Sequence, residues 1–109
     1  MKIRKEIIGS FTVLEIKGRI DTVHSSVLET EVNHVYDSGE KNMILNCNGL
    51  SYICSSGLRV FLVAQKKAIS LKGKLYLCNM QPAIKEVFVI SGFSNLFRIL
   101  DTQEEALEK

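Results

Sequence analysis

Short apolar runs alternate with longer amphipathic segments along this chain, and this alternation limits the possible folds more than any other feature. Residues 43–47 and 74–78 are predicted to be buried strands, because they carry apolar side chains with little polar alternation. The segments that follow them place apolar residues three or four positions apart, which is typical of helices that pack on a sheet. Strands that alternate with helices favour a sheet with parallel members and right-handed crossovers.

The chain begins with a predicted β-hairpin. Its strands are residues 2–8 and 11–17, joined at Gly9-Ser10. Gly18 is expected to end the second strand, and residues 19–22 are expected to connect it to a helix. Because the hairpin is antiparallel and the later strands are parallel, the sheet is predicted to be mixed.

Helix ends are predicted from capping residues, glycine and proline. Ser26 and Thr102 are each followed three residues later by glutamate, a capping-box pattern, and Pro82 suits a first helical turn. The predicted helices cover residues 25–37 and 58–71, run from Pro82 to Gly92 and start again at Thr102, with a last strand at 97–100. The predicted apolar face of the second helix contains Leu58, Phe61, Leu62, Ala68 and Ile69. The order β-β-α-β-α-β-α-β-α predicts an α/β fold with a mixed sheet of four to five strands.

The composition predicts one folded domain over residues 1–109. Hydrophobic residues make up 46% and charged residues 24%, which are ordinary proportions for a globular domain. The formal net charge is +2 and basic residues do not cluster with aromatic ones, so we expect no nucleic-acid partner. No apolar run approaches the roughly 18 residues of a membrane span, and the first residues lack the apolar core of a signal peptide. We therefore expect a cytoplasmic protein without a membrane partner, and a monomer, with a dimer left open.

The cysteines and histidines form no metal-ligand pattern. The three cysteines, an odd number, give no disulfide framework. Cys47 and Cys78 fall in predicted strands, where free cysteine behaves as a small apolar residue. His24 and His34 have no companion ligand one helical turn away, and Asn48-Gly49 is interpreted only as a turn. We expect no metal, no cofactor and no catalytic residue.

Ser55-Ser56-Gly57 is the most informative local motif. It lies where the chain leaves the run 50–54 and enters the first turn of the second helix. The N–H groups of a first turn have no partner inside the helix, and the helix dipole favours negative charge there. A phosphate on Ser55 would therefore meet hydrogen-bond donors already in place. The alternative interpretation is that one of the two serines is the N-cap of the helix.

Cys54 and Arg59 flank this motif. Arg59 is four residues after Ser55, on the same helix face, where its guanidinium could pair with a phosphate. A thiol at a helix N-terminus can have a lowered pKa, so Cys54 is a candidate for thiol or phosphoryl-transfer chemistry. Arg59 as a solvated surface residue and Cys54 as a small packing residue are the alternatives.

Several segments together resemble the bacterial anti-sigma factor antagonists, single-domain members of the STAS superfamily. Residues 18–21 are similar to the Gly-x-Leu/Ile-Asp segment of the family, and 43–53 to its central strand. Residues 54–58 align with the family motif Asp-Ser-Ser-Gly-Leu, and 82–88 and 91–93 resemble its later Pro-x-Val-x-x-x-Phe and Ser-Gly-Leu/Phe segments. The resemblance covers almost the whole chain. This chain has Cys54 where the family usually has Asp, and Arg59 where Gly is common.

The resemblance implies a partner-switching role in transcription regulation. A family member binds an anti-sigma factor that is also a serine kinase, so that a sigma factor is released. The kinase then phosphorylates the first serine of the motif, Ser55 here, which switches binding off, and a serine phosphatase restores it. The partner-binding residues that the resemblance implies are Asp21, Cys54, Ser55, Ser56, Gly57 and Arg59.

Two other functions stay open from the sequence. The chain could be a STAS interaction module without a working phosphorylation switch in another bacterial signalling complex. It could also be an enzyme that uses Cys54 for thiol or phosphoryl-transfer chemistry. Phosphorylation that depends on Ser55 separates these alternatives from the main prediction.

Overall fold

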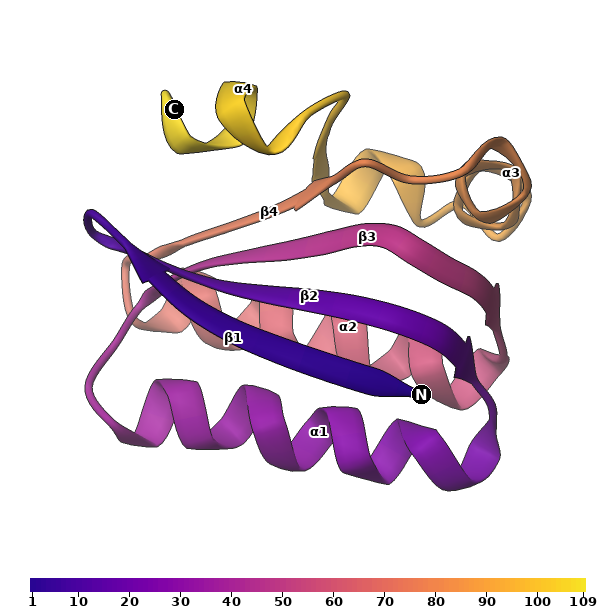
Figure 1. Cartoon of the computed structure of the whole chain (residues 1–109), viewed down its shortest axis with the longest axis horizontal. Coiled ribbons are helices and arrows are strands. Elements are labelled where there is room, and N and C mark those ends of the chain that lie inside the picture. The colour runs from indigo at the N-terminus through magenta and orange to yellow at the C-terminus, as the bar shows by residue number, and fades with distance from the viewer.

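A computed structural model describes all residues from Met1 to Lys109 (Figure 1). The predicted α/β class and the predicted element order are confirmed, with a short 3₁₀ turn, η1, added before the last strand. The elements are β1 (Lys2–Ile8), β2 (Phe11–Ile20), α1 (Thr22–Asp37), β3 (Asn42–Ile53), α2 (Ser55–Ser70), β4 (Lys74–Cys78), α3 (Pro82–Ile90), η1 (Ser94–Leu96), β5 (Arg98–Leu100) and α4 (Gln103–Leu107).

The five strands form one mixed sheet in the order β1-β2-β3-β4-β5. β1 and β2 are antiparallel, and every later neighbour pair is parallel. The outer side of β1 is an edge of the sheet, and most of its residues are exposed, including the charged residues at positions 2, 4, 5 and 6. The expected mixed sheet of four to five strands is therefore confirmed with five strands.

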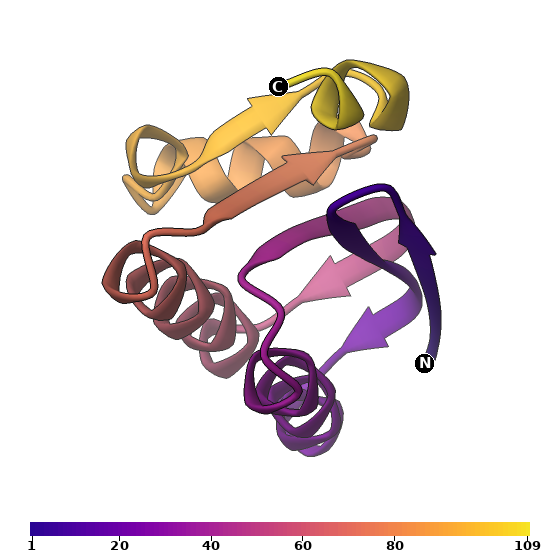
Figure 2. The same cartoon turned by 90° about the vertical axis from the view of Figure 1, so that its left-hand side faces the viewer.

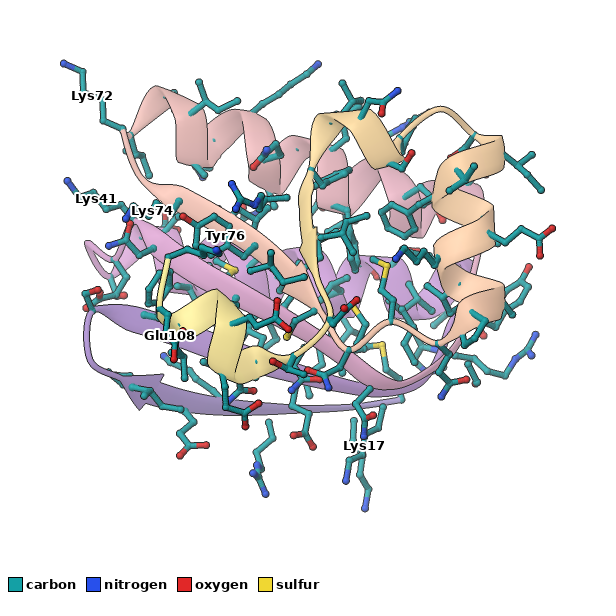
Figure 3. All side chains as sticks on the ribbon, turned by 90° about the horizontal axis from the view of Figure 1, so that it is seen from above. Lys17, Lys41, Lys72, Lys74, Tyr76 and Glu108 are labelled. Atoms are coloured by element: carbon teal, nitrogen blue, oxygen red, sulfur yellow. The ribbon has the colours of Figure 1, made fainter.

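Two apolar clusters hold the helices against opposite faces of the sheet. The larger one contains 22 buried residues and joins α1, α2 and α3 to one face, where Phe61 and Phe88 are completely buried. The smaller one contains 6 buried residues and joins Ala106 of α4 to the other face. Figure 2, turned by 90°, shows α1 and α2 on one side of the sheet and α4 on the other. Much of the face next to α4 stays uncovered, as Figure 3 shows from above.

Two predicted strand ends are wrong. β2 continues through Gly18 to Ile20, because Gly18 adopts a φ of +100° at a shift in the register with β3 and does not end the strand. β3 likewise continues through Asn48-Gly49 to Ile53, so this pair is not a turn. The register between β2 and β3 shifts beside it, as at a β-bulge, which absorbs an extra residue inside a strand.

The predicted start of α1 is also wrong. The N-cap is Asp21, whose carboxylate accepts a hydrogen bond from the His24 N–H at 2.9 Å, and the helix begins at Thr22. The Ser26 hydroxyl instead donates to the Val23 carbonyl. The capping prediction at the other end of the chain is confirmed, because Thr102 caps α4.

The start of α2 agrees with the predicted place of the serine motif, and its packing face needs one correction. The helix begins at Ser55, so the motif lies in the first turn as predicted, three residues before the amphipathic pattern that begins at Leu58. Ile69 is 67% exposed and does not belong to the packed face, whereas Leu58, Phe61 and Ala68 are buried as predicted. None of the helices is both long enough and apolar enough to pass through a lipid bilayer.

Candidate functional site

The paired ends of β2 and β3 bring two helix N-termini together. Ile20 pairs with Ile53 at the end of the parallel ladder, and the Cys54 N–H donates to the Ile20 carbonyl at 3.0 Å. Each strand leads directly into a helix, so α1 and α2 start side by side and run in the same direction (Figure 1). The positive ends of two helix dipoles therefore lie at the same corner of the molecule.

Ser55 is the first residue of α2, and its side chain is exposed. The N-cap is Cys54, so the interpretation that one of the serines caps the helix is wrong. The Ser55 hydroxyl makes no hydrogen bond within the chain. This combination leaves a free hydroxyl at the positive end of a 16-residue helix.

Ser56 is half-buried and connects the two helices. Its Oγ lies 2.9 Å from the Ser25 Oγ of α1 and 3.0 Å from the Cys54 Sγ. Ser25 is 4% exposed and also donates to the Asp21 carbonyl at 2.8 Å. The two adjacent serines of the motif therefore have different environments: one hydroxyl faces solvent and the other is held in a network between α1 and α2.

The Cys54 thiol is more acidic than an ordinary cysteine. Desolvation alone would raise its pKa, but interactions with the Ser56 side chain, the Gly57 backbone, the Ser25 side chain and the Ser56 backbone outweigh desolvation and lower the pKa to about 7. The Cys54 Sγ lies 3.0 Å from the Ser56 Oγ and 3.6 Å from the Ser25 Oγ. A substantial fraction of Cys54 is therefore thiolate at neutral pH, immediately before Ser55.

Asp21 lies at the start of α1, at the same corner. Its carboxylate accepts from the His24 N–H and lies 2.8 Å from His24 Nδ1. The hydrogen bond from the His24 backbone is the largest cause that lowers the pKa of Asp21 below its ordinary value. Beside it, the Arg19 guanidinium lies 4.2 Å from the centre of the Tyr52 ring, a cation–π contact.

A shallow cavity of about 220 Å³ opens between the first turns of α1 and α2. It is lined by Thr22, Ser25, Ser26, Glu29, Ser56, Arg59 and Val60. Arg59 is exposed and forms no ion pair, even with Glu29 across the cavity. Its guanidinium is thus free for an anion or for a partner.

Gly57 packs where a larger residue does not fit. A Cβ at this position would lie 2.7 Å from Ile20 Cγ2 and 2.9 Å from Ile53 Cγ1. The glycine therefore sets how closely the start of α2 approaches the ends of β2 and β3. Its role in this structure is packing, and it is buried beneath the surface that Ser55 shares with its neighbours.

The structure brings the predicted residues together and adds Ser25, which the sequence analysis missed. The sequence predicts Ser25 only as the first residue of the first helix, with no role in the site. Its contacts with Ser56 and Cys54 cross 31 and 29 positions of the chain. Only the parallel pairing of the two preceding strands brings these residues into contact, so no local pattern indicates them.

Residues 2–106 match the sequence model of the STAS domain. This chain belongs to the STAS domain family. A relative that is named as an anti-sigma factor antagonist, BtrV of Bordetella bronchiseptica, is 34% identical over 106 residues, which cover 97% of this chain and 91% of BtrV.

Solved structures of STAS proteins share the fold. An anti-sigma factor antagonist from Mycobacterium paratuberculosis aligns with a TM-score of 0.89 and 20% identity, covering 98% of this chain and 91% of that one. The Bacillus cell fate determinant SpoIIAA in its phosphorylated form aligns with a TM-score of 0.76 and 23% identity, covering 98% of this chain and 97% of that one. At sequence identities this low, the structural similarity shows the STAS fold alone and does not indicate which residues act in this chain.

Proposed function

We propose that this STAS domain is an anti-sigma factor antagonist whose binding to an anti-sigma factor serine kinase ends when Ser55 is phosphorylated. The observation that carries the proposal is the exposed, unbonded Ser55 hydroxyl at the first position of α2. The domain acts by binding a protein partner in the cytoplasm, and it catalyses no reaction itself. The similarity to BtrV, which bears the name of such an antagonist, supports the general role.

The surroundings of Ser55 favour a phosphate. A phosphoserine carries roughly 1.5 to 2 negative charges near pH 7, and a helix N-terminus favours an anion by about 0.3–1 kcal/mol. Arg59 is one turn further along α2 and has no acidic partner, so its guanidinium is available to the phosphate. Phosphorylation therefore requires little rearrangement inside the domain.

The same phosphate would disrupt a docked partner. The proposed contact surface contains Asp21, Ser55 and Arg59, with Cys54 and Ser56 just beneath it. Adding charge to the centre of such a surface costs affinity through repulsion and desolvation. A difference of about 1.4 kcal/mol changes the dissociation constant tenfold, so a few kcal/mol separate a bound from a free state.

Cys54 distinguishes this site from that of most family members. Where the family usually has Asp before the acceptor serine, this chain has a thiol whose pKa is about 7. We infer that the thiolate fraction supplies part of the negative charge that the carboxylate supplies elsewhere. A kinase that recognises a negative charge beside Ser55 is expected to phosphorylate this serine faster when the Cys54 thiol is ionised.

The test combines phosphorylation with binding. The purified protein is incubated with the anti-sigma factor kinase of the same organism and ATP, and its mass is measured. We expect one added phosphoryl group, about 80 Da, on the wild type and on Ser70→Ala, but not on Ser55→Ala. Ser70 is a matched control because it is an exposed serine at the far end of α2. Addition to Ser55→Ala at the wild-type rate would contradict the proposal.

Binding is then measured with the same kinase and the nonhydrolysable ATP analogue AMP-PNP, which prevents turnover. Unmodified protein and Ser70→Ala are expected to bind equally, and phosphorylated protein at least about tenfold more weakly. If the kinase binds tightly but adds no phosphate, the chain is a STAS interaction module without a phosphorylation switch. Equal affinity of the modified and unmodified forms would also refute the switch.

A further inference from the structure

The uncovered face of the sheet contains a second polar cavity, remote in the fold from Ser55. Its volume is about 230 Å³, and no apolar side chain lines it. The lining residues come from β2, β3, the position just after β4, and α4: Glu15, Asn46, Asn48, Asn79, Gln103 and Glu104. It lies on the α4 side of the sheet, which Figure 3 shows from above. Helix α2, which carries Ser55, and its neighbour α1 pack on the opposite face.

The floor of this cavity is fixed by hydrogen bonds. Asn46 is 7% exposed, its Nδ2 donates to Gln103 Oε1 at 2.7 Å, and its Oδ1 accepts from the Asn48 N–H at 3.0 Å. The Asn48 carbonyl in turn accepts from Gln81 Nε2 at 3.0 Å. Both ends of the Asn46 amide are thus used within the chain, and the side chains around it are held in place.

Asn79 leaves an unsatisfied acceptor at the same cavity. Its backbone is in the left-handed region, with φ of 57°, immediately after β4. Its Oδ1 is buried from solvent and has no hydrogen-bond partner. Buried polar atoms in native structures are nearly always paired, so this oxygen lacks a donor, and a donor in the cavity reaches it only when the Asn79 side chain turns toward the cavity.

The cavity carries negative charge that the chain only partly neutralises. Lys17 Nζ lies 3.5 Å from Glu15 Oε1, but the Lys17 side chain is 61% exposed, and Figure 3 shows Lys17 at the border of this face. Glu104 forms no ion pair. Its charge is felt locally: desolvation by burial and then the negative charge of Glu104 raise the pKa of the Cys78 thiol to about 12.

We propose that this cavity binds a guanidinium group. Guanidinium offers five N–H donors in one plane and no acceptor, which suits the two carboxylates and, once the Asn79 side chain turns toward the cavity, its unpaired oxygen. A calcium ion would need 6–8 oxygen ligands, yet the oxygens of Asn46 and Gln103 already accept hydrogen bonds. The guanidinium can belong to a small free guanidinium compound or to an arginine of a partner protein.

The proposal is tested by titrating isotopically labelled full-length protein with agmatine, a small guanidinium compound, and following the side-chain amide signals by NMR. We expect saturable shifts confined to the amides of Asn46, Asn48, Asn79 and Gln103. The double variant Glu15→Gln/Glu104→Gln should raise the dissociation constant at least about tenfold, because charge-assisted hydrogen bonds are lost. Glu108→Gln, a carboxylate on the same helix outside the cavity, should bind agmatine like the wild type.

Asn79→Gly removes the unpaired oxygen while glycine keeps the left-handed backbone, and it should weaken binding several-fold. Tetramethylammonium chloride, which has no N–H donor, and calcium chloride are titrated at matched ionic strength. Equal shifts from either salt, or unchanged agmatine affinity in the double glutamine variant, would overturn the proposal. If a blocked Gly-Arg-Gly peptide binds more tightly than agmatine, the ligand is an arginine of a partner protein. If the peptide binds more weakly, the ligand is a small free guanidinium compound.

Discussion

The Ser25 Oγ lies 2.9 Å from the Ser56 Oγ and joins the first turn of α1 to the first turn of α2. This contact holds the second serine of the motif inward, while the neighbouring Ser55 remains exposed. The relationship connects the stability of the helix pair with the environment of the proposed acceptor.

Replacing Ser25 with alanine is expected to reduce the free energy of unfolding by about 1–3 kcal/mol. Ser25 is buried and takes part in hydrogen bonds with Ser56 and the Asp21 carbonyl, each of which contributes about 0.5–1.5 kcal/mol. Urea unfolding followed by circular dichroism measures the change. Ser26→Ala is the control, because that exposed hydroxyl bonds only within its own helix turn. Equal effects of the two substitutions would show that the interhelical contact contributes nothing.

Cys54 is expected to react with iodoacetamide at a rate that rises with pH and reaches half of its maximum near pH 7. The thiolate is the nucleophile, and the pKa of this thiol is lowered to about 7. Ser56→Ala should move the midpoint to higher pH, because the hydroxyl stabilises the thiolate. Cys54→Ser should abolish the fast reaction, since Cys47 and Cys78 are buried. A midpoint above pH 8 in the wild type would be inconsistent with this environment.

The lowered pKa of Cys54 also makes the free energy of unfolding depend on pH. The folded state favours the Cys54 thiolate more than the unfolded state does, so this contribution is fully present above the ordinary thiol pKa of 9.0. It is lost as the pH falls through about 7. A comparison of wild type with Cys54→Ser across this range isolates the contribution of the thiol.

Gly57→Ala is expected to destabilise the domain by about 1–3 kcal/mol, as overpacking does in well-packed interiors. The added methyl group would lie 2.7 Å from Ile20 and 2.9 Å from Ile53. Alanine favours a helix over glycine by about 1 kcal/mol, so the packing cost must exceed this gain. Chemical denaturation of the variant measures the sum. Ser70→Ala on the same helix should stay within about 0.5 kcal/mol of the wild type, and a Gly57→Ala protein as stable as this control would disprove the close fit.

Tyr36→Phe is expected to cost about 0.5–1.5 kcal/mol, because the buried Tyr36 hydroxyl donates to the Ala64 carbonyl at 2.8 Å. Burial raises the pKa of Tyr36 from 10.0 to about 12, so the folded state holds the neutral phenol while the unfolded chain ionises. The stability that this tyrosine provides is therefore complete below pH 10 and falls as the pH rises toward 12.

The measurement is urea unfolding of wild type and Tyr36→Phe at several values between pH 8 and 12. The difference between the two proteins should shrink as the phenol ionises. Tyr52→Phe serves as the control, because Tyr52 is 40% exposed. A difference that stays constant over the whole range would argue that Tyr36 is not buried in the way described.

Periodicity was sufficient for most elements of this fold, because a buried run such as residues 43–47 or an apolar stripe such as Leu28, Val32 and Val35 is a local property. The position at which a strand ends is not a local property of the sequence. Gly18 and Asn48-Gly49 carry turn-forming residues, yet they lie where the β2–β3 register shifts, inside a paired ladder. Whether such residues end a strand or form a bulge is decided by the partner strand, which a single sequence does not show.

The candidate site divides in the same way into a part that local sequence predicts and a part that depends on tertiary contacts. The position of Ser55 in a first turn follows from the motif, and the structure starts α2 at that residue. The capping of α1 by Asp21, instead of the predicted Ser26 pair, depends on how far β2 extends before the helix begins. Ser25 acquires its role only from the neighbouring helix, so its contribution became visible with the tertiary structure.

The charged side chains of the edge strand β1 oppose association between copies of the protein. Its free backbone groups would accept another chain's strand, but the charges at Lys2, Arg4, Lys5 and Glu6 are costly to desolvate on contact. Copies of the protein are thereby discouraged from merging their sheets into aggregates. A regulator present at high concentration can then remain available for exchange between partners.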